Sequence, residues 1–383
     1  MAQRVRHAWI AGLLLSVLLL SGIPGRAVVL AQPPDDPLLL HIDGDLWSWQ
    51  GADQPLTQLT SWGLNRAPLL SPDGTRAAYE SGAQVFVDWL QTINGAGGFD
   101  YPENIWVLDV PTSETYRIAD QPADAVYDGP DAPGRYILRT GLSWSPDGQQ
   151  VAWFELALDT VTATGDQSIG TGQLVTYDFA SGTKHVVVSF PLTEDNAVLD
   201  FYGVAWGRPG IALRIGLPQA DYPRELRVYD PASGEVLAQT DLDDFTPSWV
   251  YSASWLQDGD QDYLFDAQYG KGRMDWQTGE IEALDEAPRL VSPNAPDGAQ
   301  FYYTGETWML ALPGQSPQDL GSRTVPCGIS RDGQWAAYCR DELNPANGYY
   351  EDTVIVQSAD EQIEVGRYHR PLPQWGPVMW VMP

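Results

Sequence analysis

The chain has 383 residues, of which 43% are hydrophobic and 19% charged, and its formal net charge at neutral pH is −30. This length and composition allow a large buried core. The negative field excludes nucleic acid and anionic membranes as partners, because proteins bind phosphate groups chiefly through Lys and Arg. The two cysteines and four histidines show no zinc-ligand spacing, so we expect no metal site of that kind.

The first residues are typical of a secretory signal peptide. Two arginines precede an apolar run over about 8–20, and small residues follow up to Ala31. The run is short for a membrane span, so cleavage after Ala31 is favoured over a retained anchor. We expect 1–31 to be removed on export, leaving 32–383 as one soluble periplasmic or extracellular domain with no stable membrane insertion.

A hairpin pattern recurs along the rest of the chain. Each copy has an apolar strand, a Ser-x-Asp-Gly or Pro-Asp-Gly turn, and a second strand with apolar residues three and five positions after the glycine, which places both on one strand face. Four clear copies span 68–82, 141–156, 291–305 and 327–341. Two degenerate copies span 206–216 and 255–266.

A second hairpin follows each copy, with Asp, Ser, Gly or Thr in its turn. These hairpins span 104–119, 173–189, 225–240, 271–284, 307–321 and 352–366. Two hairpins make a four-stranded antiparallel sheet, and such sheets bury both faces by packing around a ring. The pattern predicts an all-β chain, a single β-propeller of four-stranded antiparallel blades, with no helix of useful length.

The two ends of the propeller region predict how the ring closes. Residues 38–62 carry three strands, and the last full blade is followed by a further apolar strand, 377–383, in which Trp380 matches Trp144 of the repeat. Pairing of this C-terminal strand with the N-terminal blade gives one blade shared by both termini. Together with the six other blades, this shared blade predicts a propeller of seven blades.

The Ser-Pro-Asp-Gly turns at 71–74 and 145–148, each followed by a short apolar and aromatic strand, resemble the WD-like repeats of TolB-type proteins. They are also similar to the propeller domains attached to prolyl-oligopeptidase-like peptidases. The resemblance covers nearly all of 37–383 and implies the fold, but such repeats serve scaffolds, binding proteins and enzyme lids alike. The chain lacks TolB's N-terminal α/β domain and the peptidases' hydrolase domain, so neither group's partners nor activity are implied.

Nucleophilic catalysis finds little support in the motifs. No Gly-x-Ser-x-Gly elbow occurs, and Ser71, Ser145 and Ser330 fall in repeat turns, where their hydroxyl groups or the neighbouring Asp cap the backbone. We therefore name no catalytic residue.

An acidic turn offers a weak cation site. Asp258, Asp260 and Asp262 alternate like the carboxylates of a calcium loop, but the following glycine and the distant bidentate acid are missing. We interpret the segment as a solvated turn and expect no cofactor, with calcium as the alternative.

Insertions gather in the loops that leave a propeller on one face, between second and third strands and between blades. They span 83–103, 121–140, 159–171, 218–224 and 342–351. Aromatic side chains beside acids on a rigid scaffold are typical of recognition sites, although they can also simply pack the loops down. The ligand-binding residues we expect are Asp88, Trp89, Tyr101, Asp128, Tyr136, Tyr349 and Tyr350.

These observations favour an exported, monomeric, non-catalytic binding or scaffold module for a protein, peptide or glycan. The alternative is a carboxylate-based hydrolase or lyase that acts on carbohydrate at the same face, because two carboxylates about 5 to 10 Å apart can cleave a glycosidic bond. With 51 acidic residues, composition cannot nominate such a pair.

The two cysteines predict a disulfide. Cys327 and Cys339 flank the turn at 331–333 on adjacent antiparallel strands. If Ile329 faces Ala337, then Cys327 faces Cys339 within bonding reach. The alternative is two buried apolar thiols.

Overall fold

The structure is a computed structural model. It describes residues 37–51, 54–93, 101–129, 132–160, 170–192, 204–215, 225–241, 253–258, 261–266, 272–283, 290–292, 295–304, 306–321, 323–344 and 350–369. The predicted signal peptide, 1–31, and the predicted closing strand, 377–383, lie outside these residues.

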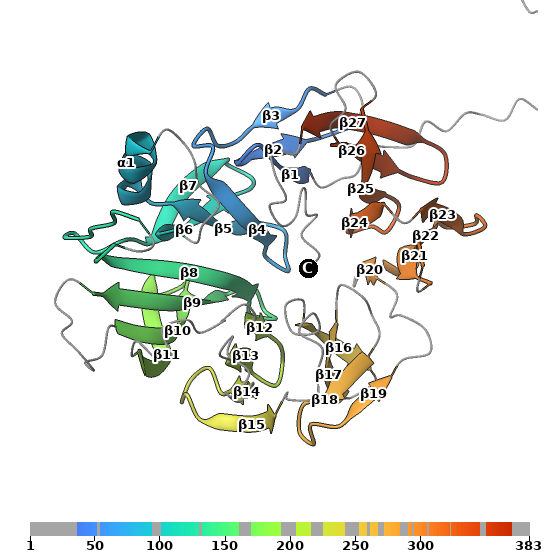
Figure 1. The fold of residues 1–383 in the computed structure, drawn as a ribbon. Helices are drawn as coiled ribbons and strands as arrows, with labels where there is room; N and C mark the ends of the chain where they lie inside the picture. Colours follow the sequence, from blue (N-terminus) through green and yellow to red (C-terminus); the bar gives the residue numbers. More distant parts are fainter. Residues whose placement is uncertain are drawn as a thin grey trace, which may run out of the picture. The chain divides into compact units, whose positions relative to one another are not determined.

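The described residues form seven antiparallel sheets, each made of strands that are consecutive in the sequence (Figure 1). The first sheet has three strands, β1 (Leu38–Ile42), β2 (Asp45–Trp49) and β3 (Thr57–Gln58). The second has β4 (Asn65–Leu70), β5 (Arg76–Gly82), β6 (Glu103–Asp109) and β7 (Glu114–Ala119), and the third has β8 (Arg135–Trp144), β9 (Gln150–Asp159), β10 (Gly170–Asp178) and β11 (Thr183–Leu192).

Four further sheets follow in the same order. They are β12 (Val204–Trp206), β13 (Ile211–Ile215), β14 (Glu225–Tyr229) and β15 (Val236–Asp241); β16 (Ala253–Asp258), β17 (Gln261–Asp266), β18 (Gly272–Asp275) and β19 (Ile281–Ala283); β20 (Leu290–Ser292), β21 (Ala295–Tyr303), β22 (Trp308–Ala311) and β23 (Gln318–Gly321); and β24 (Thr324–Ile329), β25 (Ala336–Leu343), β26 (Tyr350–Gln357) and β27 (Gln362–His369). The prediction of four-stranded antiparallel sheets built from paired hairpins is confirmed.

Consecutive sheets pack through their first strands. β4 contacts β8, β8 contacts β12, β12 contacts β16, and β20 contacts β24. Apolar side chains fill these junctions, as where Ile105 of the second sheet packs with Trp144 and Trp153 of the third. Successive side chains of a strand point to opposite faces of the sheet, so each sheet can bury residues against both of its neighbours.

The repeat turns are closed by their own side chains. Ser71 Oγ donates to Asp73 Oδ1 over 2.6 Å, and the same bond joins Ser145 to Asp147 over 2.7 Å. Gly74 has a positive φ of 73°, which favours glycine. The prediction that these serines are structural turn residues is confirmed. We call this side of the sheets the turn end and the opposite side the long-loop end.

The turn of the sixth sheet departs from the repeat. Strand β21 already includes Gly298, and Ser292 pairs with Ala295 before it. The position of the capping serine is taken by Ala295, which has no hydroxyl group for Asp297. Strand β21 thus begins before the position at which the repeat places its turn glycine.

Several first strands contain a β-bulge that the sequence pattern did not indicate. The register shifts between Arg66 and Leu69, and again between Pro326 and Gly328. Ile329 pairs with Ala336 instead of Ala337, and beyond the bulge Val325 pairs with Cys339, so the predicted register in which Cys327 faces Cys339 is wrong. One extra residue in a strand displaces every pairing on its far side, and a two-residue alternation alone does not reveal it.

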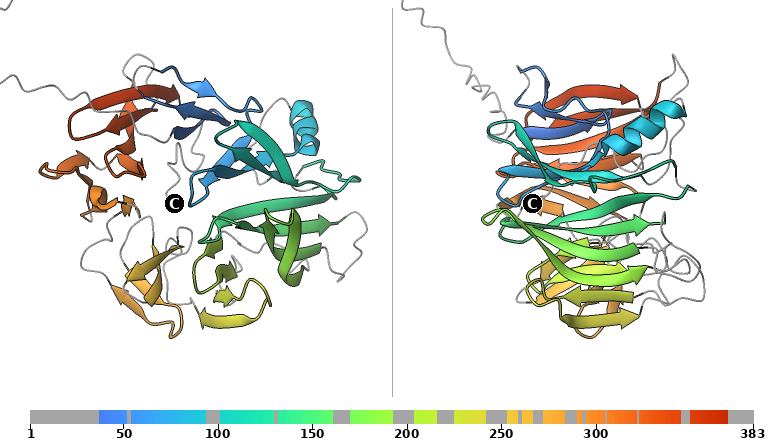
Figure 2. Two further views of the ribbon diagram at one scale, coloured as in Figure 1. Left: turned by 180° about the vertical axis from the view of Figure 1, so that it is seen from behind. Right: turned by 90° about the vertical axis from the view of Figure 1, so that its left-hand side faces the viewer.

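One helix, α1 (Gln84–Thr92), corrects the expectation that the chain has no helix of useful length. It lies at the long-loop end of the second sheet (Figure 2). Phe86, Trp89 and Leu90 have the spacing of one helical face, but the segment is nine residues long and its N-cap, Ala83, makes no side-chain cap. The sequence signals for a helix are therefore weak in this segment, and the prediction of a loop there is wrong.

The connection predicted over 121–140 is also shorter than expected, because β8 begins at Arg135. Within the described ranges, no helix has the length and apolar character needed to cross a membrane.

Candidate functional site

An aromatic cluster forms at the long-loop end of the second and third sheets. Phe86 of α1 stacks on Tyr101 with ring centroids 4.0 Å apart, and Trp89 meets Tyr127 edge-on at 5.3 Å. Tyr127 in turn meets Tyr136, which lies on β8, at 4.9 Å. The structure therefore brings together three of the predicted ligand-binding residues, Trp89, Tyr101 and Tyr136, with two that the prediction did not name.

The members of this aromatic cluster differ in exposure. Phe86, Tyr127 and Tyr136 are buried, at 3%, 3% and 8% exposed, and serve as packing residues. Trp89 and Tyr101 are half-buried and keep part of their surface accessible. Packing thus accounts for Tyr136, whereas Trp89 and Tyr101 remain available for contact.

The predicted acids lie at the edge of the cluster. Asp88 and Asp128 are both exposed, and Asp88 Oδ1 accepts a hydrogen bond of 2.8 Å from Gln84 Nε2 within α1. The remaining predicted residues belong to another part of the chain. The backbone of Tyr350 pairs with Leu343 in the seventh sheet, its side chain is outside the described part, and Tyr349 lies outside the described residues.

An ion cluster with two buried carboxylates, which the sequence pattern did not indicate, supports the aromatic cluster. Arg66 Nε lies 3.0 Å from Glu80 Oε2 and also forms an ion pair with Glu103. The guanidinium carbon of Arg66 lies 4.8 Å from the ring centroid of Tyr101. Burial lowers the pKa of Arg66, but the charges of Glu103 and Glu80 outweigh burial and raise it. Arg66 is therefore a fixed cation under the aromatic cluster.

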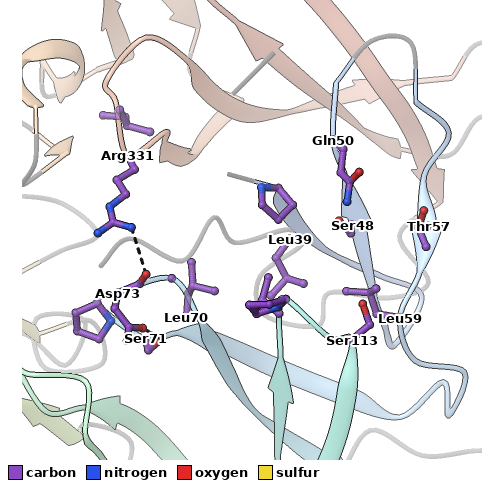
Figure 3. A pocket seen from close by; sticks show the side chains of 16 residues that line it. Leu39, Ser48, Gln50, Thr57, Leu59, Leu70, Ser71, Asp73, Ser113 and Arg331 are labelled. Carbon is purple, nitrogen blue, oxygen red and sulfur yellow. Dashed lines mark hydrogen bonds between the residues drawn. The ribbon is translucent and has the colours of Figure 1, made fainter. Parts of the chain in front are cut away.

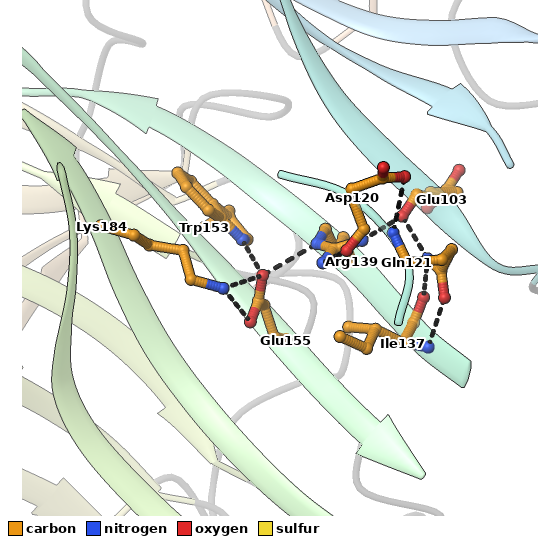
Figure 4. Close-up of polar contacts among 8 residues, drawn as sticks. All are labelled: Glu103, Asp120, Gln121, Ile137, Arg139, Trp153, Glu155 and Lys184. Carbon is orange, nitrogen blue, oxygen red and sulfur yellow. Dashed lines mark hydrogen bonds and ion pairs between the residues drawn. The ribbon is translucent and has the colours of Figure 1, made fainter. Parts of the chain in front are cut away.

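A second buried cluster joins the second and third sheets (Figure 4). Arg139 Nε lies 2.8 Å from Glu155 Oε1, and Arg139 also donates to the carbonyl oxygens of Glu103 and Asp120. Lys184 Nζ lies 3.1 Å from Glu155 Oε2. Burial raises the pKa of Glu155, but the charges of Arg139 and Lys184 outweigh burial, so the pKa lies below its ordinary value. Glu155 therefore stays ionised and paired.

A loop residue completes the junction. The side chain of Gln121 donates to the carbonyl oxygens of Glu103, over 2.7 Å, and Ile137, over 2.9 Å, and accepts from the Ile137 N–H over 2.8 Å. The second sheet, its following loop and the third sheet are thus fixed to one another beneath the aromatic cluster. Such rigid support favours a binding surface on the loops above it.

This charged network is not arranged for carboxylate catalysis. Glu80, Glu103 and Glu155 are each ion-paired, and their side chains are 1% to 4% exposed. A general acid or base must reach its substrate. These three buried carboxylates therefore serve structure.

Two hollows lie at the turn end. One, of about 160 Å³, is lined by Leu39, Leu70 and Ile329 of the first, second and seventh sheets (Figure 3). Arg331 Nη1 crosses beside it to donate to the Asp73 carbonyl oxygen over 3.4 Å. Its lining mixes apolar residues with polar ones such as Ser48, Gln50 and Thr57, and its one carboxylate, Asp73, is already bonded to Ser71.

The other hollow, of about 650 Å³, lies between the third and fourth sheets and has polar walls. Its acids are engaged already, because Asp147 accepts from Ser145 and Asp178 accepts from Ser181. Arg208 forms a two-oxygen ion pair with Asp262 over 3.0 Å. The polar groups of this hollow therefore do not converge on a common point.

The same ion pair occupies one of the acids considered for calcium. Asp262 faces Arg208, the backbone of Asp258 lies in β16, and Asp260 lies outside the described residues. Across the described ranges, no group of three or more His, Cys, Asp or Glu side chains is placed to hold a metal ion.

No protein-family model and no curated protein matches the sequence. Among solved structures, the β-propeller domain of the Trilobed protease from Pyrococcus furiosus aligns with 88% of this chain and 99% of its own, at 13% identity and a TM-score of 0.41. An oligogalacturonate lyase in complex with manganese aligns with 87% of this chain and 84% of its own, at 15% identity and a TM-score of 0.43.

Two peptidases are similar over part of their length. Porphyromonas gingivalis dipeptidyl peptidase 4 aligns with 84% of this chain at 12% identity and a TM-score of 0.38. Pyrococcus horikoshii acylaminoacyl peptidase aligns with 84% at 11% identity and a TM-score of 0.44. The chain spans 48% of each peptidase chain.

Proposed function

We propose that the protein is a non-catalytic binding or scaffold module that recognises a protein, peptide or glycan at the long-loop end of its second and third sheets. The observation that supports this most directly is the aromatic cluster around α1, in which Trp89 and Tyr101 stay partly accessible beside the ion pairs of Arg66 with the buried Glu80 and Glu103. Aromatic side chains held by a rigid scaffold lose little entropy on binding and supply much of the affinity at recognition sites.

A binding comparison tests this proposal. Purified protein is applied to glycan and peptide arrays as wild type, as Trp89→Ala, and as Tyr116→Ala, which removes an aromatic of 39% exposure from β7. We expect Trp89→Ala to weaken the strongest interaction by about tenfold or more, because truncation of a central aromatic anchor costs over ~1.4 kcal/mol. Tyr116→Ala should bind like the wild type.

The same samples separate binding from catalysis. Each array component that binds is incubated with the protein, and its products are analysed by mass spectrometry. Cleavage that disappears when an exposed acid such as Asp88 or Asp128 is replaced would replace the binding proposal with the carbohydrate hydrolase or lyase. Equal loss of binding in Trp89→Ala and Tyr116→Ala would show that the aromatic cluster is not the site.

We also propose that the sheets close into a seven-bladed propeller, with 377–382 as the missing inner strand of the first sheet. In the described residues β1 pairs with β2 alone, and the hollow lined by Leu39, Leu70 and Ile329 lies beside it at the turn end. A strand placed at the edge of β1 would satisfy its backbone and could extend toward this hollow.

A hydrogen bond that recurs between neighbouring sheets supports a specific contact for the closing strand. Trp144 donates its indole N–H to the Leu69 carbonyl oxygen over 2.8 Å, and Trp255 donates to the Ala205 carbonyl oxygen over 3.0 Å. In both, a tryptophan four positions before its own turn glycine reaches the residue five positions before the turn glycine of the preceding sheet. Trp380 holds the tryptophan position of the repeat, and the matching acceptor in the seventh sheet is the carbonyl of Gly328.

Export completes the proposal. We propose that 1–31 is removed and that 32–383 acts as a monomer in the periplasm or outside the cell, without a cofactor and without nucleic-acid or membrane partners. The net charge of −30 and the signal-like first residues support this. The N-terminal sequence of the secreted protein, expected to begin at Gln32, checks the cleavage.

A further inference from the structure

Cys327 and Cys339 bring their sulfur atoms together inside the seventh sheet. The structure has both as free, buried cysteines, with their Sγ atoms 2.6 Å apart and the residues 3% and 2% exposed. A disulfide bond measures about 2.05 Å, so a further approach of roughly 0.6 Å would complete one.

The β-bulge of β24 creates this approach. Pro326 pairs with Tyr338 and Gly328 pairs with Ala337, which leaves Cys327 as the extra residue of the strand. Cys339 pairs with Val325, two residues before Cys327. The contact between the sulfur atoms therefore depends on the bulge and not on direct cross-strand pairing.

We propose that Cys327 and Cys339 form a disulfide bond in the exported protein. Their two thiols lose two protons and two electrons as the sulfur–sulfur bond forms. A thiol oxidant, either a protein disulfide or a small-molecule disulfide, accepts them and is reduced to two thiols. The bond joins β24 to β25 across the turn at the start of the seventh sheet.

The surroundings indicate when the bond forms. Burial, followed by the contact with Cys339, raises the pKa of the Cys327 thiol well above its ordinary value. Since the thiolate is the reacting species, the folded sheet oxidises slowly. Strand β24 is also covered by β20, β21 and β22 of the sixth sheet. The bond therefore forms before these sheets pack and is shielded from reductants afterwards, which makes it structural and not a reversible switch.

Alkylation of the full-length protein tests the bond. Protein secreted through an oxidising compartment is unfolded in guanidinium chloride with iodoacetamide, with or without prior reduction, and its intact mass is measured. We expect no alkyl group without reduction and two after reduction. Two alkyl groups without reduction, or a disulfide-linked dimer on a non-reducing gel, would overturn the proposal.

Stability measurements give an independent readout. Closing this loop restricts the unfolded chain, so we expect a melting temperature about 5 °C lower in the Cys327→Ala/Cys339→Ala variant. Wild type that is reduced while unfolded and then refolded with reductant should melt with the variant. The variant should not respond to reductant. A wild type whose melting temperature is the same after either treatment would count against the bond.

Discussion

The two ends of the second and third sheets are built in different ways. At the turn end, each turn is closed within a few residues, as by the Ser71 Oγ to Asp73 Oδ1 bond of 2.6 Å. At the long-loop end, the contacts join distant segments, as where Arg139 of the third sheet donates to the Glu103 carbonyl of the second. Local turns can repeat from sheet to sheet, whereas these long-range contacts depend on which two sheets lie side by side.

This difference indicates where a recognition site could arise. A turn whose hydrogen bonds are made by its own residues holds two strands together, and few of its side chains can change without breaking those bonds. The long-loop end instead places Trp89 and Tyr101 over buried ion pairs whose partners come from β4, β5 and β6. Specific surfaces of this kind depend on non-local contacts, so changes to those contacts should have larger effects than changes at the turn end.

The largest effect is expected from the buried Arg139. Its side chain is 1% exposed and pairs with Glu155, itself 2% exposed. Arg139→Ala leaves the Glu155 carboxylate with Lys184 and Trp153 and removes a donor from the carbonyl oxygens of Glu103 and Asp120. We expect the free energy of unfolding to fall by about 3 to 5 kcal/mol, measured by urea denaturation.

Arg135→Ala is the matched control for this prediction. Arg135 lies on the same strand and pairs with Asp124 and Asp159, but its side chain is 32% exposed. We expect a loss below about 1 kcal/mol, as is usual for exposed ion pairs. Similar losses for Arg135→Ala and Arg139→Ala would show that the buried network does not hold the long-loop end together.

An intermediate effect is expected when the proposed closure at the turn end is broken. A chain that ends at Gln374 loses the strand that carries Trp380. The loss of one buried Trp or Met alone costs a couple of kcal/mol at ~25 cal/mol per Å², so we expect a clearly lower urea midpoint or aggregation. Trimming Gln32 to Asp35 should leave the midpoint unchanged.

Trp380→Phe refines this prediction, with Trp144→Phe as its counterpart, because Trp144 makes the indole bond to Leu69 that the closure reproduces. Removing one indole donor should lower stability by about 1 kcal/mol in each variant. A Trp380→Phe protein, or one ending at Gln374, that unfolds with the wild type would contradict both the closing strand and the seven-blade count.

The smallest effect concerns pH and His41 at the long-loop end. Its Nε2 lies 2.6 Å from the Asn65 carbonyl oxygen, where β4 begins. Burial lowers the pKa of His41, despite the opposing effects of Asn65, Asp45 and Asp43. As pH falls below the ordinary value near 6.5, the unfolded chain binds a proton that folded His41 does not, so stability is lost until the lower folded pKa is reached.

The measurement is the free energy of unfolding of wild type and His41→Gln between pH 7.5 and pH 5. Gln retains a donor for the Asn65 carbonyl but does not titrate. We expect the wild type to lose more stability than His41→Gln over this interval. Parallel curves for the two proteins would contradict a lowered pKa of His41.

The sequence predicted those parts of the fold in which neighbours in the chain are also neighbours in space. The hairpins, their Ser-x-Asp-Gly turns and the four-stranded sheets all follow from short-range signals, as at Ser145 and Asp147. The helix α1 was missed because its apolar spacing is short and its start has no capping side chain. Three of the seven predicted ligand-binding residues, Trp89, Tyr101 and Tyr136, meet in the aromatic cluster. Aromatic or acidic character on an insertion does not show which insertions lie side by side.

By itself, then, the sequence determined the repeat, because turn chemistry and two-residue alternation act within about fifteen residues. Only the tertiary structure decided that Arg66 meets Glu103, that Arg139 meets Glu155 and that the bulge brings Cys327 to Cys339. The packing of one sheet on the next determines which buried charges pair. The contacts along a whole strand pair determine where a bulge forms. Neither leaves a periodic trace in the order of residues.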